Sequence, residues 1–395
     1  MTQTSIPTVR LSAGYFFYFA IYGGLLPFLA RFLRDQGFAF TEISQTAAVL
    51  TLSMSLGPFV WASVSDRTGK RMVWARLSSL ALLISLLLLG LLSVPVVVVA
   101  MVGLIGIALS AILPQMEAVT LQYLGPASTR YGNIRLWGTL GFGVVVLALG
   151  ALLDYFGASV LPWCLALIAV ATLVTQMLIK DVPRVAGHVS EQAPWSAFLQ
   201  RMGQFPVWGL FLALFLWSVT MAAYNTFFDL YLQEYGYSGA AIGRYLALAP
   251  LAEVLLFLVL SRLLQRWGAK SVLVMALLAT SGRWLMTAWL ADSWVWLALA
   301  QCLHALSFGA VHGTAIYLLS RMFPDNQQAR AQATYIAFST GLGLVSGNLL
   351  AGQLWAFPQG SQWVFTLNAV IALVAGLLVA VALQRKRMLA LKTSA

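Results

Sequence analysis

The 395-residue chain has few charged residues: they make up 9% of it, and Asp and Glu together occupy only 12 positions. Soluble domains carry about 25% charged residues. Hydrophobic residues reach 61% here, which leaves too few polar side chains to cover the surface of a soluble protein of this size. The composition therefore excludes an ordinary soluble protein.

The chain also lacks the patterns that mark metal sites, phosphate sites and disulfide frameworks. Its two cysteines, Cys164 and Cys302, both lie in apolar runs, and there is no HExxH pattern and no glycine-rich phosphate loop. The histidines of HALSFGAVH are eight residues apart, a poor match to metal ligands on one helix face. We therefore expect no metal, no bound cofactor and no enzymatic activity.

Long apolar runs take the place of these patterns, and runs of roughly 20 residues span a bilayer as helices. They predict an all-α integral membrane protein with twelve transmembrane helices. No cleavage-type small-residue motif follows the first run, so we expect a retained helix and not a signal peptide. The expected spans are about 11–33, 41–64, 72–93, 95–123, 131–153, 158–179, 206–233, 239–264, 271–291, 294–321, 329–356 and 361–383.

The polar segment 180–205 separates two halves, 1–179 and 206–395, that repeat one another. RDQGFAFTEI (34–43) aligns with QEYGYSGAAI (233–242) at an offset of 199, and SDRTGKR (65–71) aligns with LQRWGAK at the same offset. Two loops that share one offset and one place in the topology indicate a parallel repeat. We expect two pseudo-symmetric six-helix bundles joined by a cytoplasmic linker.

The basic residues set the expected orientation. With the N-terminus in the cytoplasm, 18 of the 23 Lys and Arg residues fall at cytoplasmic ends of spans and three fall outside. This asymmetry follows the positive-inside rule. We therefore expect both termini, including the C-terminal tail, in the cytoplasm. The net charge of +11 then needs no nucleic-acid partner.

Two arginines, Arg135 and Arg283, lie within spans, each with an acid at the same expected depth. Glu117 and Arg135 are equidistant from Pro126, which lies inside the turn GPASTR, and Glu253 and Arg283 are equidistant from Gly268. Ionisable groups inside a membrane are costly, face the bundle interior and pair. We expect one ion pair in each half, although such pairs can also serve only to fix helix register, and a shallow arginine can snorkel to the membrane surface.

Other polar residues inside the spans leave two interpretations open. Tyr15, Tyr18 and Tyr22 follow helical spacing on the first span, which fits either packing or the lining of a cavity. His304 and His312 fit either a proton relay or hydrogen-bonded core positions. Asp229 lies near an outer helix end, where we expect it to be solvated.

Five segments of the chain resemble those of a known family: YGNIRLWGTLGF (131–142), the loop SDRTGKR, AEVLLF (252–257), GRW (282–284) and LH (303–304). They are similar to the major facilitator superfamily, in the branch of the 3-phenylpropionate permeases and, more distantly, of lactose permease. The resemblance covers nearly the whole chain. The loop departs from the superfamily pattern in having Ala62 where a glycine would stand.

The resemblance implies roles for individual residues. Glu117 and Arg135 match the acid and arginine of lactose permease that engage substrate, and Arg283 and His304 match its proton-coupling network. Gln301 and Ser307 stand where that permease has a lysine and a glutamate, which implies a simpler relay. The expected groups are substrate binding by Glu117, Arg135, Tyr18, Tyr22, Trp137, Tyr224 and Asn225; proton coupling by Glu253, Arg283, His304 and His312; and gating by Asp66, Arg67, Gly69 and Lys70.

The resemblance implies a secondary active transporter that works as a monomer in a bacterial inner membrane. The expected function is proton-coupled uptake of a small organic solute by alternating access, and the expected substrate is an aromatic carboxylate such as 3-phenylpropionate. A sugar or nucleoside symporter is the nearest alternative, followed by an efflux antiporter, although the segment LWGTLGFG lacks the proline of drug/proton antiporters. A non-transporting membrane receptor or an integral-membrane enzyme is a remote alternative.

Overall fold

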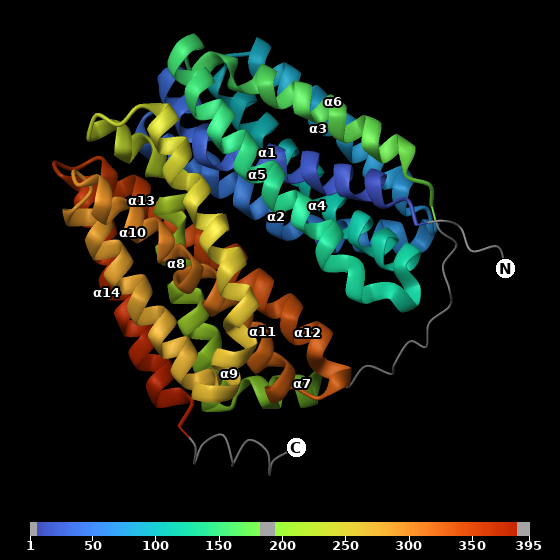
Figure 1. Cartoon of the computed structure of the whole chain (residues 1–395), viewed down its shortest axis with the longest axis vertical. Coiled ribbons are helices and arrows are strands. Elements are labelled where there is room, and N and C mark those ends of the chain that lie inside the picture. The colour runs from blue at the N-terminus through green and yellow to red at the C-terminus, as the bar shows by residue number, and fades with distance from the viewer. Residues whose placement is uncertain (1–5, 182–193, 385–395) are drawn as a thin grey trace. The chain divides into compact units, whose positions relative to one another are not determined.

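The computed structural model describes residues 6–181 and 194–384, apart from the side chains of residues 62, 63, 66 and 67. All regular elements in this part of the chain are helices (Figure 1). They are α1 (Thr8–Asp35), α2 (Phe40–Thr68), α3 (Arg71–Leu91), α4 (Pro95–Leu124), η1 (Gly125–Arg130), α5 (Tyr131–Phe156), η2 (Ala158–Val160), α6 (Leu161–Leu178), α7 (Trp195–Met202), α8 (Phe205–Glu234), α9 (Gly239–Trp289), α10 (Trp294–Cys302), η3 (Ala305–Ala310), α11 (Val311–Met322), α12 (Asp325–Tyr335), η4 (Ile336–Gly343), α13 (Leu344–Trp355) and α14 (Gly360–Ala382).

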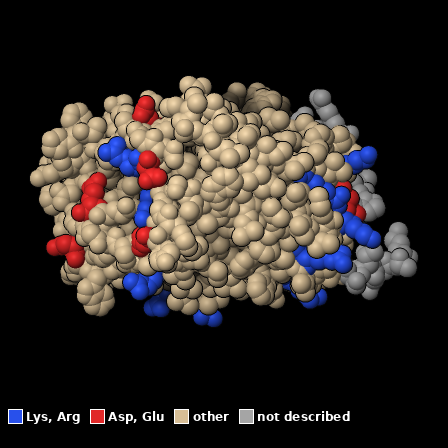
Figure 2. All heavy atoms as spheres, turned by 90° about the horizontal axis from the view of Figure 1, so that it is seen from above, with Lys and Arg blue, Asp and Glu red and all other residues tan. Residues whose placement is uncertain are grey.

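Ten helical segments among the described residues are long and apolar enough to cross a membrane. Two of them, of 62 and 51 residues, are far longer than the roughly 20 residues that a bilayer needs. The first contains η1, where Ala127 has non-helical angles, and the second is broken at Gly268, whose φ of 77° suits glycine. Dividing both at these predicted turns gives twelve segments. Figure 2 shows one face on which charged residues gather toward two ends, with a broad band of other residues between them.

The chain divides into two compact units, Met1–Ala186 with Asn225–Ala247, and Gly187–Tyr224 with Leu248–Ala395. In the first unit α1 packs mainly against α5 and α6, while α4 packs against α2 and α3. These contacts bring α1, α4 and α5 together (Figure 1). The residues predicted to bind substrate in the first half therefore come from helices that share one bundle.

Three helical features depart from the simple pattern of apolar spans. The short helix α7 lies within the segment predicted only as a polar linker, and buries Phe198 against Phe323. The expected spans 294–321 and 329–356 are each interrupted by a π-helix, η3 and η4. Such π-segments are rare and occur frequently at functional sites, and η3 lies where the two intramembrane histidines were expected.

Candidate functional site

The crossing of α1 and α5 is shaped by two glycines of the RLWGTLGF segment. A Cβ on Gly141 would collide with the backbone carbonyl of Phe16, and a Cβ on Gly138 would collide with the Phe19 ring and the Arg135 guanidinium. Small residues let helices approach closely within membranes. Glycine at these positions therefore allows α5 to lie against α1 and leaves room for Arg135 above Phe19.

Arg135 lies on an aromatic platform from α1. Its guanidinium carbon is 3.8 Å from the centroid of the Phe19 ring and 5.9 Å from that of Tyr15. A cation over an aromatic face is attracted by the ring quadrupole. Among the described residues no hydrogen bond and no ion pair to Arg135 is found, and the side chain is partly exposed. The stack holds one face of the guanidinium and leaves its N–H edges to bind other groups.

Glu117 is engaged by a tyrosine and not by Arg135. The Tyr131 hydroxyl donates a hydrogen bond to Glu117 Oε1 at 3.0 Å. The direct ion pair that we expected between Glu117 and Arg135 is not among the ion pairs of the described residues. The expected pair between Glu117 and Arg135 is therefore not formed. The carboxylate is bound instead by Tyr131, in the first turn of α5.

The tyrosines of α1 form a hydrogen-bonded set next to Arg135. The hydroxyls of Tyr18 and Tyr22 are 3.1 Å apart, and Tyr18 also lies 3.1 Å from the Leu109 carbonyl. A phenol has one proton and a carbonyl only accepts, so Tyr18 donates to Leu109 and accepts from Tyr22. Tyr18 is buried and Tyr22 partly exposed. Trp137 is 48% exposed, and no hydrogen bond or ring contact among the described residues joins it to this set.

Arg283 in the second unit is fully buried and held by four groups. Its Nε donates to the Ala300 carbonyl and its Nη1 to Ser307 Oγ, both at 3.0 Å. Its guanidinium carbon lies 4.2 Å from the Tyr224 ring centroid and 4.4 Å from that of Trp284. None of the ion pairs among the described residues involves Arg283. The expected ion pair between Arg283 and Glu253 is therefore not formed among the described residues.

Glu253 lies instead against η3. Its side chain occupies the space that a Cβ on Gly309 would need. Glu253 and Arg283 therefore both contact η3: Arg283 binds Ser307, and Glu253 lies against Gly309, two residues later. The carboxylate and the guanidinium form no ion pair with each other. Neither this contact nor the role of Ser307 can be read from local spacing, because a π-helix changes which side chains share a face.

The two histidines belong to one aromatic column. His304 and Phe308 stack with centroids 5.4 Å apart, Phe308 and His312 stack at 6.1 Å, and His312 Nδ1 lies 3.0 Å from the Tyr335 hydroxyl. At the other end His304 lies 5.6 Å from the Tyr224 ring. Tyr224, expected to bind substrate, donates to Gln301 Oε1 at 2.9 Å. Tyr224 therefore joins the arginine to the histidine column.

A polar cluster that the sequence did not reveal lies where α1 and α5 end. Arg31 Nη2 is 3.1 Å from Asp154 Oδ1, and Arg31 Nη1 is 3.9 Å from Asp229 Oδ1. Asp229 has no exposed surface and accepts a hydrogen bond from Gln233, so the expectation that it is solvated was wrong. Asn225, one turn before Asp229 on α8, is partly exposed.

Asp154 also caps the start of α9. Its carboxylate accepts the backbone N–H groups of Gly239 and Ala240 at 2.9 and 3.0 Å, a favourable place for an anion because helix N-termini carry partial positive charge. Beside it, Gly150 and Gly239 approach so closely that a Cβ on either would collide with the other's backbone. The only signal in the sequence was the presence of three ionisable residues near span ends.

The expected gating residues are only partly described. The side chains of Asp66 and Arg67 lie outside the described part of the structure. Gly69 ends α2 with a φ of 67°, and Lys70 precedes α3 and is exposed. The gating role of all four residues stays a prediction.

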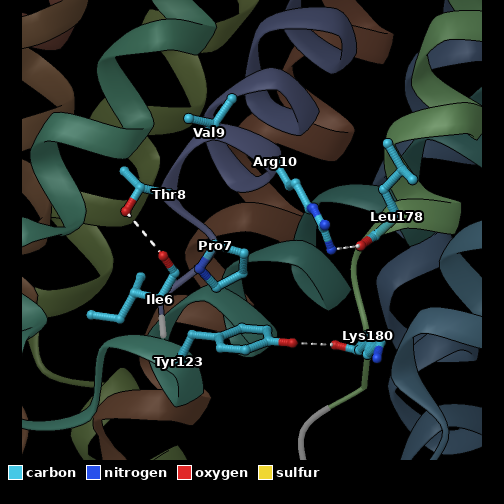
Figure 3. Close-up of a pocket in the computed structure, with 8 residues that line it drawn as sticks. All are labelled: Ile6, Pro7, Thr8, Val9, Arg10, Tyr123, Leu178 and Lys180. Carbon is cyan, nitrogen blue, oxygen red and sulfur yellow. Dashed lines mark hydrogen bonds between the residues drawn. The ribbon is translucent and has the colours of Figure 1, made fainter. Parts of the chain in front are cut away.

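A cavity of about 510 Å³ lies at the start of α1 (Figure 3). Arg10 donates to the Leu178 carbonyl and Tyr123 to the Lys180 carbonyl, both at 3.1 Å, so these side chains cap the end of α6. None of the predicted site residues lines this cavity. The hydrogen bonds of Arg10 and Tyr123 at this cavity are explained by capping of α6.

Comparisons with known proteins identify the family and the fold of the chain. Residues 8–367 match the family model described as the MFS_1 like family. A probable 3-phenylpropionic acid transporter of Escherichia coli (strain K12) is 30% identical over 371 residues, which cover 92% of this chain and 95% of that protein. A maltose permease of Geobacillus stearothermophilus is 29% identical over 358 residues, or 86% of each chain. The crystal structure of the nucleoside transporter NupG matches with a TM-score of 0.83 at 16% identity, over 97% of this chain and 100% of that one, a likeness of fold alone.

Proposed function

The chain belongs to the MFS_1 like family of the major facilitator superfamily, and we propose that it takes up a small aromatic carboxylate, such as 3-phenylpropionate, by proton-coupled symport. As a member of this family it is a multi-pass secondary transporter. The proposal adds the substrate class, the direction and the coupling ion, and it places both termini in the cytoplasm of a bacterial inner membrane.

The observation that carries the substrate class is Arg135 on the Phe19 ring, with no hydrogen bond or ion pair from its N–H groups to another described residue. A guanidinium binds a carboxylate through two parallel N–H···O bonds. The ring centroids of Phe19 and Tyr22 are 5.8 Å apart, and the two rings offer an apolar surface for a phenyl group. The named activity of the Escherichia coli relative supports the same class.

For coupling, we propose that Glu253 carries the proton next to the Arg283, Tyr224 and His304 cluster. A carboxylate inside the membrane is costly when charged, so its protonation can be tied to a change of conformation. His312 is connected to this cluster through Phe308, which stacks on both histidines. The proposal needs no cofactor besides the proton, and a monomer in the bilayer suffices.

A sugar is the second candidate, because the maltose permease is almost as similar to this chain. Glu117 and Tyr131 are partly exposed residues, and their carboxylate and hydroxyl would serve as hydrogen-bond partners for sugar hydroxyls. In that case Arg135 would bind hydroxyl oxygens and not a carboxylate.

The test is uptake into proteoliposomes with an imposed pH gradient. We expect accumulation of labelled 3-phenylpropionate that is abolished when a protonophore collapses the gradient, with no competition from excess maltose or uridine. Uptake of maltose or uridine in place of the carboxylate would reject the substrate class. Accumulation that persists without a proton gradient would reject the coupling.

A further inference from the structure

Tyr131 is a neighbour of both Glu117 and Arg135, the acid and the arginine of the first unit. It is the first residue of α5, and its hydroxyl donates to Glu117 Oε1 on α4 at 3.0 Å. Arg135 follows four residues later on the same helix, so the two side chains are neighbours on one helix face. The carboxylate is therefore bound by a residue one helical turn from Arg135, and it forms no ion pair with that arginine among the described residues.

The Tyr131 ring is held in place by packing. Its edge meets the Tyr15 ring, with centroids 6.3 Å apart and an interplanar angle of 86°. Tyr15 is fully buried and its hydroxyl lies 3.4 Å from Thr120 Oγ1, one turn beyond Glu117 on α4. Edge-to-face packing of this kind is favourable. The position of the Tyr131 hydroxyl is thus set by α1 and α4 together.

A carboxylate this close to an arginine competes with any anionic ligand. Arginine–carboxylate pairs form charge-assisted, often bidentate hydrogen bonds, and Glu117 would take up the N–H edges that a substrate carboxylate needs. A hydrogen bond from a tyrosine hydroxyl to the charged oxygen stabilises an alternative position of Glu117. The distance between the acid and the arginine then decides how available Arg135 is.

We propose that Tyr131 is a specificity-determining positioning residue that holds Glu117 away from Arg135 and so leaves the guanidinium to a substrate carboxylate. This inference rests on the proposed function, in which Arg135 is the counter-charge of the substrate. Tyr131 acts through Glu117 and need not touch the substrate. Its loss should therefore weaken the binding of anions and spare a neutral ligand that does not need the arginine charge.

Tyr131→Phe isolates the hydroxyl, because it keeps the ring that packs on Tyr15. We expect the affinity for 3-phenylpropionate, measured by isothermal titration on purified protein, to fall about tenfold as Glu117 moves to Arg135. The double variant Tyr131→Phe/Glu117→Gln should return to the affinity of Glu117→Gln alone, since a neutral amide cannot neutralise the arginine. Tyr123→Phe is the matched control: it removes another tyrosine hydrogen bond from α4, the one to the Lys180 carbonyl, and should leave affinity unchanged.

The double variant separates positioning from a merely structural role. If Tyr131→Phe binds as well as the parent protein, or if the double variant stays as weak as Tyr131→Phe, the inference is wrong. Arg135→Ala, measured in parallel, tests the premise. Weak binding by Arg135→Ala with normal binding by Tyr131→Phe rejects only this inference, whereas normal binding by Arg135→Ala rejects the proposed function and the inference with it.

Discussion

Arg31 and Asp154 form an ion pair between α1 and α5, with Arg31 Nη2 3.1 Å from Asp154 Oδ1. The same carboxylate caps the first turn of α9 through Gly239 and Ala240. One side chain therefore ties together three helices at the end of the bundle that we predict to face outward. This contact has to loosen if α9 is to move away from α5 during transport.

We predict that Asp154→Ala loosens this end of the bundle. It removes an ion pair and a helix cap, and caps alone are worth about 0.5–2 kcal/mol. Val146 is fully buried, and its carbonyl lies against Gly243 of α9, so a cysteine in its place reports on opening. In a background without native cysteines, a membrane-impermeant maleimide should label Val146→Cys faster when Asp154 is also alanine.

The control for this experiment is Asp35→Ala. Asp35 is an exposed acid at the end of α1, and none of the described residues forms an ion pair with it. Its replacement should leave labelling of Val146→Cys at the parent rate. Equal labelling with and without Asp154 would show that the cluster does not hold this end closed.

The close approach of α1 and α5 yields a second prediction. Gly141→Ala places a methyl group on the Phe16 carbonyl, and overpacking of this kind costs about 1–3 kcal/mol. We expect a lower thermal unfolding temperature in detergent and weaker 3-phenylpropionate binding, because Arg135 sits on the same crossing. Gly143→Ala on the same helix meets no atom within 4 Å and should be neutral or slightly stabilising. Similar behaviour of the two variants would mean that the crossing is not tightly packed.

The expected orientation can be tested at the two ends of α5. Ser128 and Ser159 are exposed residues that flank this helix, and Ser→Cys is nearly isosteric. In cells that express the protein without Cys164 and Cys302, an impermeant maleimide should label Ser159→Cys and miss Ser128→Cys. The opposite pattern would place both termini outside and overturn the positive-inside assignment.

Proton coupling is tested by Glu253→Gln. A glutamine cannot gain or lose the proton, so the variant should fail to accumulate 3-phenylpropionate against its gradient while still exchanging it across the membrane. The two assays are run on the same proteoliposomes, with Glu117→Gln alongside. Normal accumulation by Glu253→Gln would move the proton site elsewhere, with Glu117 the next candidate.

The sequence predicted the features that depend on apolar length and on turns. The breaks at η1 and Gly268 fall where GPASTR and QRWGAK predicted them, because a glycine with positive φ and a polar turn are local properties. Counted from these breaks, Arg135 lies in the second turn of α5 and Arg283 lies well inside the helix that follows Gly268. The family was identified from the segment around Arg135, whose glycines fit the α1–α5 crossing.

The partners of the charged groups could not be predicted in this way. Equal depth on two helices allows Glu117 to meet Arg135, but the Tyr131 hydroxyl lies within reach of the same oxygen and binds it instead. Asp229 was misjudged because its partner Arg31 is nearly 200 residues away in the chain. The cluster around Arg283 depends on η3, since a π-helix shifts Ser307 and Gly309 relative to an α-helical register.

The central claim is that Arg135 is the counter-charge of a substrate carboxylate. Binding of 3-phenylpropionate by three variants tests this claim. Arg135→Lys keeps the charge without the bidentate fork and should bind weakly. Arg135→Ala should lose at least ~3 kcal/mol, or over a hundredfold in affinity, because the fork is gone and Glu117 faces the ligand. Glu117→Gln should be much milder, since it removes a competing acid. If Glu117→Gln weakens binding as much as Arg135→Ala, and both variants lose maltose binding in parallel, the carboxylate account is contradicted and a sugar takes its place.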